Sequence, residues 1–423
     1  MKKLVFFAFM ALATMLSAQK ADYYEGNLEF KGQKLPLTLD VSIGKDTTAL
    51  LGSPAQTKEL IPATKIVLRN DSLLFSVKPL KATFKGKINQ TKDTVCGNFK
   101  QLFVDIPLCL VKKEKPEIII NRPQNPPANP SYIQEEITFR TQGVDYDFKG
   151  TLTYPKKEGK YPLMIMISGS GIQNRDEEIM QHRPFAVIAD YMANNGIAVF
   201  RYDDRGFGSE NAELFNATTL DYALDVESAI NAVKNHPNID TDKIGLVGHS
   251  EGGLIAPIVA SRNSDVDFLI LLAGPGVNGM EVLIEQNKAI YKASKNQEEL
   301  SKQLEMLQSR KFEGAAQPWM KCFLDLEPAE YLKKVKQPIL VLNGTKDLQV
   351  LHYQNLPAIK KALKEGGNKS YKIHKLKGLN HLFQECKTGS PNEYYEIEQT
   401  ISPKVLKLMK DFVKIIQRNN FLK

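Results

Sequence analysis

The chain has 423 residues, of which 42% are hydrophobic and 25% charged, a composition typical of folded globular proteins. This length exceeds what one hydrophobic core usually supports, so it predicts two folded units. The net charge of +8 comes from lysines spread along the chain and not clustered with aromatic residues. We therefore expect a solvated basic surface and no nucleic-acid partner.

The first 18 residues have the three parts of a secretory signal peptide. Lys2 and Lys3 precede an apolar run over residues 4–15, and Ala18 offers a small side chain before Gln19. The run is too short for a transmembrane helix, which needs about 20 apolar residues. The sequence predicts cleavage after Ala18 and an exported protein, periplasmic or secreted, with no transmembrane segment.

Residues 19–114 predict a small all-β domain. Alternating apolar runs separated by turn residues cover residues 35–41, 64–68, 73–77, 82–88 and 103–111. The stretch beginning at Gly26 is similar to the stretch beginning at Gly97, which favours a sheet that closes on itself with its first and last strands together. No cluster of polar residues indicates a function, so the partner of this domain is unknown.

The cysteines favour four buried thiols. Cys96, Cys109, Cys322 and Cys386 are too few and too scattered for a disulfide scaffold or a zinc site. A bridge between Cys96 and Cys109, joining neighbouring strands in an oxidising compartment, stays open as the alternative.

A proline-rich segment over residues 115–133 predicts a semi-rigid linker, and the pattern changes after it. Residues 134–423 alternate strand-like and helix-like stretches. Strands are expected at residues 137–140, 149–154, 163–167, 197–202, 244–247, 268–273, 338–343 and 370–376. Helices are expected at residues 185–194, 221–235, 253–261, 356–365 and 403–417, with a helical cap inserted at about residues 278–334. This alternation predicts an α/β fold with a mostly parallel sheet, covered on both faces.

The motif G-x-S-x-G stands between a predicted strand and a predicted helix. Gly248, Ser250 and Gly252 follow the apolar residues 244–247 and precede residues 253–261. In such a turn the serine adopts a strained backbone conformation, and the glycines let a helix and a strand approach closely. The motif predicts that the Ser250 hydroxyl stands exposed at the carboxyl end of the sheet.

A serine hydroxyl is a weak nucleophile unless a base removes its proton, so a histidine is expected later in the chain. His374 lies inside a predicted strand and His352 begins a predicted helix. His381 lies in a turn after the last strand, where it can reach the carboxyl end of the sheet. His381 is therefore the candidate base.

The candidate acid is Asp347, which follows the strand at residues 338–343. A carboxylate there can accept a hydrogen bond from the histidine and fix its tautomer. Asp325 is the nearest rival, but it lies in the helical insert and not at a strand end.

Two backbone N–H groups are needed to stabilise an oxyanion. One is expected from Glu251, directly after the nucleophile. The other is expected from Ser170, in the turn after the strand at residues 163–167, with Gly171 close behind. The glycines of this turn lack the accompanying pattern of a phosphate-binding loop.

Several residues are candidates for contact with substrate. Gly171 lies in the turn at residues 168–171, which we call the oxyanion turn. The cap supplies Trp319, Met320 and Phe323. The alternative for the three cap residues is that they bury the cap against the core.

Five stretches of residues 135–423 resemble the α/β-hydrolase superfamily, in particular the EstD-like bacterial serine esterases, which are catalogued near the S9 and S33 serine peptidases. They are residues 169–177 (GSGIQNRDE), 201–209 (RYDDRGFGS), 248–253 (GHSEGG), 343–350 (NGTKDLQV) and 378–384 (GLNHLFQ). The resemblance implies an α/β-hydrolase fold with a Ser250, Asp347 and His381 triad, and a structural role for residues 201–209. It also implies that the β-rich front domain is a module found before such esterases. Ser168 departs from the pattern, because many relatives carry a histidine there.

Together these features predict a carboxylesterase that cleaves a small-molecule ester through an acyl-enzyme, with no metal or organic cofactor. One alternative is a serine peptidase or aminopeptidase of the S9 or S33 type, since the same triad cleaves amides. The other is a non-catalytic protein that binds an envelope partner or a polymer.

Overall fold

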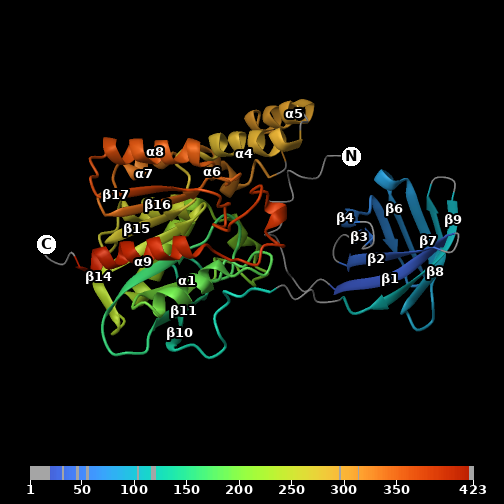
Figure 1. Cartoon of the computed structure of the whole chain (residues 1–423), viewed down its shortest axis with the longest axis horizontal. Helices are drawn as coiled ribbons and strands as arrows, with labels where there is room; N and C mark the ends of the chain where they lie inside the picture. Colours follow the sequence, from blue (N-terminus) through green and yellow to red (C-terminus); the bar gives the residue numbers. More distant parts are fainter. Residues whose placement is uncertain are drawn as a thin grey trace. The chain divides into compact units, whose positions relative to one another are not determined.

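The computed structural model describes residues 20–30, 33–43, 47–53, 57–101, 104–115, 121–294, 297–312 and 314–418. The chain divides into two compact units, Met1–Ile119 and Ile120–Lys423 (Figure 1). This division falls inside the proline-rich segment. The predicted signal peptide at residues 1–18 lies outside the described residues.

The first unit is a nine-stranded antiparallel sheet with the order β4-β3-β2-β1-β9-β8-β7-β6-β5. Its strands are β1 (Lys20–Phe30), β2 (Gln33–Ile43), β3 (Thr48–Ser53), β4 (Thr57–Pro62), β5 (Lys65–Leu68), β6 (Ser72–Val77), β7 (Ala82–Ile88), β8 (Thr94–Gln101) and β9 (Val104–Lys113). The first and last strands pair, as expected. They lie in the middle of the sheet, however, and β4 and β5 form its edges. The strand order is therefore open. The expectation of a sheet that closes on itself is wrong, because the edge strands β4 and β5 do not pair with each other.

A disulfide joins Cys96 of β8 to Cys109 of β9, which are directly opposed residues of neighbouring strands. The expectation of four buried thiols is therefore wrong for this pair. Cys322 and Cys386 are free thiols, and both are only half-buried. The open alternative was correct because the β8–β9 register places the two cysteines face to face.

The second unit is built on an eight-stranded mixed sheet with the order β10-β11-β13-β12-β14-β15-β16-β17. Its strands are β10 (Tyr132–Phe139), β11 (Phe148–Pro155), β12 (Tyr161–Ile167), β13 (Ala198–Tyr202), β14 (Ile239–His249), β15 (Phe268–Leu272), β16 (Ile339–Gly344) and β17 (Tyr371–Leu376). β10 and β11 pair antiparallel, and β11 is antiparallel to β13. The neighbours from β13 to β17 pair in parallel.

The helices of this unit follow the expected alternation with the strands (Figure 1). They are α1 (Pro184–Ala193), α2 (Thr219–Val233), α3 (Gly252–Ala260), α4 (Gly279–Ser294), α5 (Gln297–Gln308), α6 (Pro318–Asp325), α7 (Pro328–Leu332), α8 (His352–Glu365) and α9 (Pro403–Arg418). The predicted cap corresponds to α4 to α7, inserted between β15 and β16. Shorter 3₁₀ turns lie at Lys78–Leu80, Ala212–Asn216 and Pro391–Glu393.

Local sequence explains these elements. Alternate side chains of β12 enter two different hydrophobic clusters: Ile165 packs in the cluster that includes residues of α2 and α3, and Met164 packs with residues of α1 and α9. A parallel strand buried in this way reads as a continuous apolar run. α2 begins with a capping box in which Thr218 and Asp221 satisfy each other's backbone N–H groups.

The order of the strands reverses at one place on the sheet. After β12 the chain moves to β13 on one side, and it later returns to β14 on the other side of β12. Ligands of open α/β sheets bind where the order reverses, outside the carboxyl ends of the strands. Ile167 of β12 pairs with Gly248 of β14 at those ends. The turn with Ser170 and the turn with Ser250 therefore start from adjacent strand ends.

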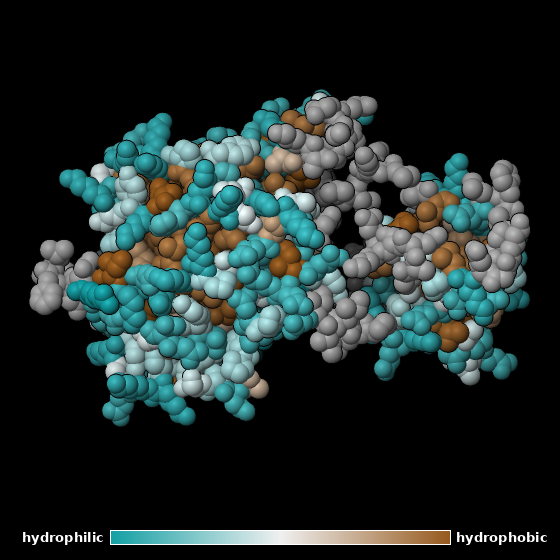
Figure 2. Space-filling view, in the orientation of Figure 1, coloured by the Kyte–Doolittle hydropathy of each residue, from teal (hydrophilic) through white to brown (hydrophobic). Residues whose placement is uncertain are grey.

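Hydrophilic residues cover much of the face shown in Figure 2, and hydrophobic residues gather between α8 and α9. A groove of about 440 Å³ lies there between β17 and α9, lined by residues that include Ile373, Phe412 and Ile415. None of the predicted site residues lines it. In the described part of the chain, every helix is too short or too polar to span a bilayer.

Candidate functional site

Ser250 occupies a strained turn between β14 and α3. Its φ of 51° lies in the left-handed region, which a residue with a side chain adopts rarely and at a cost. A Cβ on Gly248 would lie 1.9 Å from the carbonyl oxygen of Gly252, so the backbone closes this tightly only without a side chain there. The N–H of Ser250 donates to the carbonyl of Leu272 at 2.9 Å. The turn is held from outside as well as by its own residues.

The structure brings Asp347 and His381 together. Nδ1–H of His381 donates to Oδ2 of Asp347 at 2.9 Å, and both side chains are buried. The other carboxylate oxygen, Oδ1, accepts the backbone N–H groups of Gln349 and Val350 at 2.8 and 2.9 Å. Because Oδ1 is fixed by these two bonds, Oδ2 holds the imidazole in one orientation and leaves Nε2 as the basic nitrogen.

His381 lies beside the turn that carries Ser250. The rings of His381 and His249 have centroids 4.8 Å apart. Nε2–H of His249 donates to the carbonyl of His381 at 3.0 Å. Because His249 directly precedes Ser250, the predicted base is hydrogen-bonded through its carbonyl to the residue next to the predicted nucleophile.

The turn after β12 lies against Ser250 and is held by two carboxylates. A Cβ on Gly169 would lie 3.1 Å from that of Ser250. The N–H of Gly169 donates to Glu177 at 2.7 Å. The hydroxyl of Ser168 donates to Asp204 at 2.7 Å. Ser168 thus supports the turn through Asp204, where relatives are expected to use a histidine.

Asp204 is a second anchor of the same turn. Its Oδ2 accepts the N–H of Gln173 at 2.8 Å. Burial raises the pKa of Asp204 well above its usual range, although the bonds from Ser168 and Gln173 oppose that rise. Such a buried group is costly unless its hydrogen bonds are made, so the turn has one preferred conformation.

Ser170 is exposed at the tip of this turn, and Gly171 follows it with a φ of 95°. Glu251 is buried at the start of α3. Ser170 directly follows Gly169, which lies against Ser250, and Glu251 directly follows Ser250. The oxyanion role of their N–H groups stays a prediction.

The carboxylate of Glu251 connects the site to the cap. It accepts the hydroxyl of Thr219 at 2.6 Å and Nε1–H of Trp319 at 2.9 Å, and it is hydrogen-bonded to the side chain of Ser170. Burial raises the pKa of Glu251, and these three hydrogen bonds oppose that rise. One buried carboxylate therefore touches α2, the oxyanion turn and α6.

The three cap residues differ in accessibility. Met320 is fully buried, which leaves it no surface for a substrate to contact. Phe323 belongs to the larger hydrophobic cluster and stacks on Trp319, with ring centroids 5.6 Å apart. Trp319 is half-buried and keeps exposed surface. Trp319 is therefore the most accessible of the three residues. Its contact with substrate stays a prediction.

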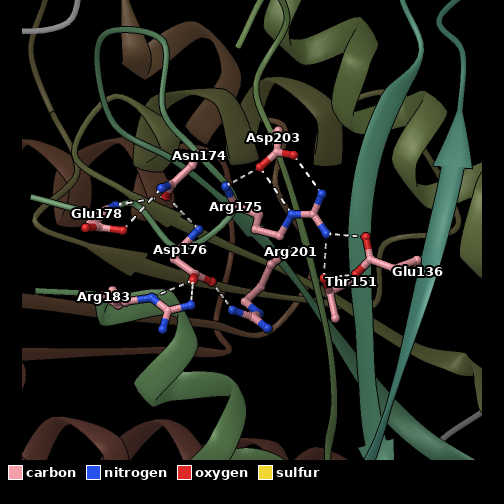
Figure 3. A network of polar contacts seen from close by, with 9 residues as sticks. All are labelled: Glu136, Thr151, Asn174, Arg175, Asp176, Glu178, Arg183, Arg201 and Asp203. Atoms are coloured by element: carbon pink, nitrogen blue, oxygen red, sulfur yellow. Dashed lines mark hydrogen bonds and ion pairs between the residues drawn. The ribbon is translucent and has the colours of Figure 1, made fainter. Parts of the chain in front are cut away.

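A polar network fixes the loop that follows the oxyanion turn (Figure 3). The guanidinium of Arg175 reaches Asp203 at 2.7 Å, Glu136 at 2.6 Å and Thr151 at 2.7 Å. Asp203 directly follows β13, whereas Glu136 and Thr151 lie within β10 and β11. Asp176 forms ion pairs with Arg183 and with the buried Arg201. Residues 201–209 thus have the structural role that the resemblance implies.

A small cavity lies behind the oxyanion turn. Its volume is about 10 Å³, roughly the space of one water molecule. The lining includes Gly169, Gly171, Asp204, Arg205 and Glu251. In the described part of the chain, no cluster of three or more His, Cys, Asp or Glu side chains forms a metal site.

Sequence reasoning gave no role to Glu177 and His249, and it gave Asp204 only the general structural role of residues 201–209. His249 stands inside the G-x-S-x-G motif, and Glu177 ends the first quoted stretch. His249 precedes Ser250, whereas the chain order of an α/β-hydrolase triad places the base after the nucleophile. A signal for both was available, because residues 169–177 contain a carboxylate, Glu177, and residues 248–253 contain a histidine, His249.

Comparisons with known proteins find similarity to hydrolases. The family model "BAAT / Acyl-CoA thioester hydrolase C terminal" matches residues 220–384. Esterase EstD of Thermotoga maritima is 29% identical over 264 residues, 60% of this chain and 62% of the esterase. The uncharacterized peptidase YtmA of Bacillus subtilis is 25% identical over 203 residues, 48% of this chain and 69% of the peptidase. The chain thus spans less than two thirds of the esterase.

Among solved structures, the acylaminoacyl peptidase of Pyrococcus horikoshii has a TM-score of 0.50 at 14% identity. The match covers 93% of this chain and 66% of the peptidase, and at this identity it bears on the fold alone. The mixed sheet, the strand-turn-helix at Ser250 and these relatives lead to one conclusion. The second unit has the fold of the α/β-hydrolase superfamily, and its sequence is similar to those of hydrolases in that superfamily.

Proposed function

We propose that the protein is a serine hydrolase that cleaves carboxylic esters. The observation that carries this proposal is the left-handed backbone of Ser250, in a turn that His249 links directly to the loop of His381. Strain of this kind persists where a side chain must be presented in a defined direction. The fold and the relatives are those of hydrolases, which supports the same reaction class.

In the proposed mechanism His381 removes the proton of Ser250, and the serine oxygen attacks the ester carbonyl. Asp347 holds the imidazole and stabilises the imidazolium that forms. The N–H groups of Ser170 and Glu251 stabilise the oxyanion. The alcohol leaves with the proton from His381, and water then releases the acid by the same sequence of steps.

The cap supports an ester over an aminoacyl amide. An aminopeptidase needs a free carboxylate to hold the substrate amine. The cap carboxylates of Glu281 and Glu327 each accept a hydrogen bond from Asn278, and Glu285 pairs with Lys288 at 2.7 Å. The carboxylate of Glu251 is engaged by three donors. Each of these carboxylates thus already has a partner within the protein.

A substrate panel tests the proposed reaction. We expect fluorophosphonate to label Ser250, and we expect acyl esters of p-nitrophenol and acyl thioesters to be hydrolysed faster than aminoacyl arylamides. Labelling is read by peptide mass spectrometry and turnover by absorbance. Faster cleavage of the arylamides would favour the peptidase, and a protein that neither labels nor turns over any substrate would point to a binding role.

We also propose that the protein is exported. The tripartite segment at residues 1–18 and the disulfide between Cys96 and Cys109 support this, because disulfides persist in oxidising compartments. We expect the mature chain to begin at Gln19. Intact-mass measurement of protein from periplasmic and culture fractions reads the first residue, and retention of Met1 in an active cytoplasmic form would contradict export.

A further inference from the structure

A second histidine–carboxylate pair lies beside the proposed triad. Glu177, in the loop after β12, faces His249, the last residue of β14, with Oε1 and Nδ1 2.9 Å apart. Both side chains are buried, at 5% and 7% exposure. The reaction proposed above gives neither of them a role.

The hydrogen bonds of this pair require a proton on each nitrogen of His249. Nδ1 faces the carboxylate of Glu177, and Nε2 faces the carbonyl of His381 at 3.0 Å. Both partners accept hydrogen bonds, whereas a neutral imidazole has only one N–H. A second proton must therefore lie between Glu177 and His249, as in an imidazolium paired with a carboxylate. The same oxygen of Glu177 also accepts the N–H of Gly169 at 2.7 Å.

These bonds form one chain across the site, from the oxyanion turn through Glu177 and His249 to the loop of His381. We propose that Glu177 and His249 are positioning residues, which hold the oxyanion turn and the loop of the base in register around Ser250. This proposal rests on the proposed function. The network of Arg175 and Asp176 fixes the loop of Glu177 (Figure 3). A shift of His249 is therefore passed to the loop of His381, through the bond from Nε2 of His249 to the carbonyl of His381.

The charge of His249 acts on the same centre. Burial tends to lower the pKa of His249, but the charge and hydrogen bond of Glu177, with a smaller effect of Asp347, raise it overall. The groups that face His249 are therefore Glu177, Asp347 and the ring of His381. The charge of Asp204 in turn interacts with that of Glu177. The positive charge of His249 thus balances carboxylates close to the proposed base.

The variant His249→Gln tests this proposal on the full-length mature chain with p-nitrophenyl acetate. One of the two links is lost, and we expect kcat to fall by about tenfold with KM nearly unchanged, the effect of one lost hydrogen bond. The unbalanced carboxylate favours the protonated form of His381. The acid limb of the kcat/KM profile should therefore move to higher pH, by roughly one unit.

Two further variants separate charge from packing. In Glu177→Gln/His249→Gln both charges are absent, and we expect the acid limb to return toward that of the wild type even if kcat stays low. His236→Gln removes a different histidine, one that pairs with Glu135 at 3.1 Å away from the triad, and should leave both kcat and the profile unchanged. A merely structural role would lower the active fraction, measured by fluorophosphonate titration, without moving the acid limb.

An acid limb of His249→Gln that coincides with that of the wild type, at unchanged kcat, would overturn the proposal. If that variant does not fold, the wild type decides by ¹⁵N NMR of its six histidines, with His249 assigned after the other five are replaced one at a time. Both ring nitrogens protonated at neutral pH supports the pair, and a single protonated nitrogen overturns it. A wild type that hydrolyses no substrate would instead refute the proposed function, and the NMR result would still test the pair.

Discussion

Replacing Ser250 by alanine is expected to lower kcat/KM for p-nitrophenyl acetate by about 10⁵-fold or more. Removal of the nucleophile of such a unit costs about as much as removal of the whole unit, and what remains comes from the oxyanion donors and binding. The fold should survive, because the side chain of Ser250 makes no contact that the turn needs, while its N–H bond to Leu272 is retained. Turnover and a thermal melt check both statements.

The strained backbone at Ser250 gives a second readout. Because φ is 51°, glycine fits this position better than alanine does. Ser250→Gly should therefore be as inactive as Ser250→Ala and more stable than it by about 0.5–1 kcal/mol, measured by denaturant unfolding. Ser228→Ala is the matched control, since that hydroxyl bonds only to a carbonyl of its own helix on an exposed face. Activity of Ser250→Ala within tenfold of the wild type would refute the assignment.

The sequence could predict those parts of the site that depend on residues close together in the chain. The motif around Ser250 joins a strand to a helix within a few positions, and Asp347 and His381 each lie in the loop that follows a strand. Parallel strands bring their carboxyl ends to one edge of the sheet, so strand-end residues far apart in the sequence converge there. The α/β unit could be predicted because strand-like and helix-like patterns alternate along the chain, and each pattern is visible within a short stretch.

The parts that sequence could not predict depend on pairings between distant residues. Glu177 and His249 are 72 positions apart, and Glu251 and Trp319 are 68 apart. Their types permit many other partners, and only the packed loops select these. Met320 shows the same limit, because an apolar residue of a cap helix satisfies its pattern equally well facing the core or a substrate. The edges of the first sheet, at β4 and β5, were likewise set by pairing register.

Asp347→Asn is expected to lower kcat by about 10⁴-fold while leaving the fold intact. Oδ1 of Asp347 accepts two backbone N–H groups, from Gln349 and Val350, which only an oxygen can accept. The amide of the variant must therefore keep its oxygen there and turn its NH₂ toward His381. Nδ1 of His381 then becomes an acceptor, and its proton moves to Nε2, the nitrogen that must receive the proton of Ser250. Holding the wrong tautomer costs about 10⁴ in such a triad.

Asp347→Ala provides the comparison that isolates the tautomer. Without any side chain at that position, the imidazole of His381 is free to choose its tautomer, so this variant should be less stable than Asp347→Asn yet no less active. Two unpaired N–H groups cost roughly 1–3 kcal/mol each, which unfolding in denaturant measures. If the asparagine variant keeps activity within tenfold of the wild type, another group must orient the base. His249 would then be the first residue to replace, because its ring centroid lies 4.8 Å from that of His381.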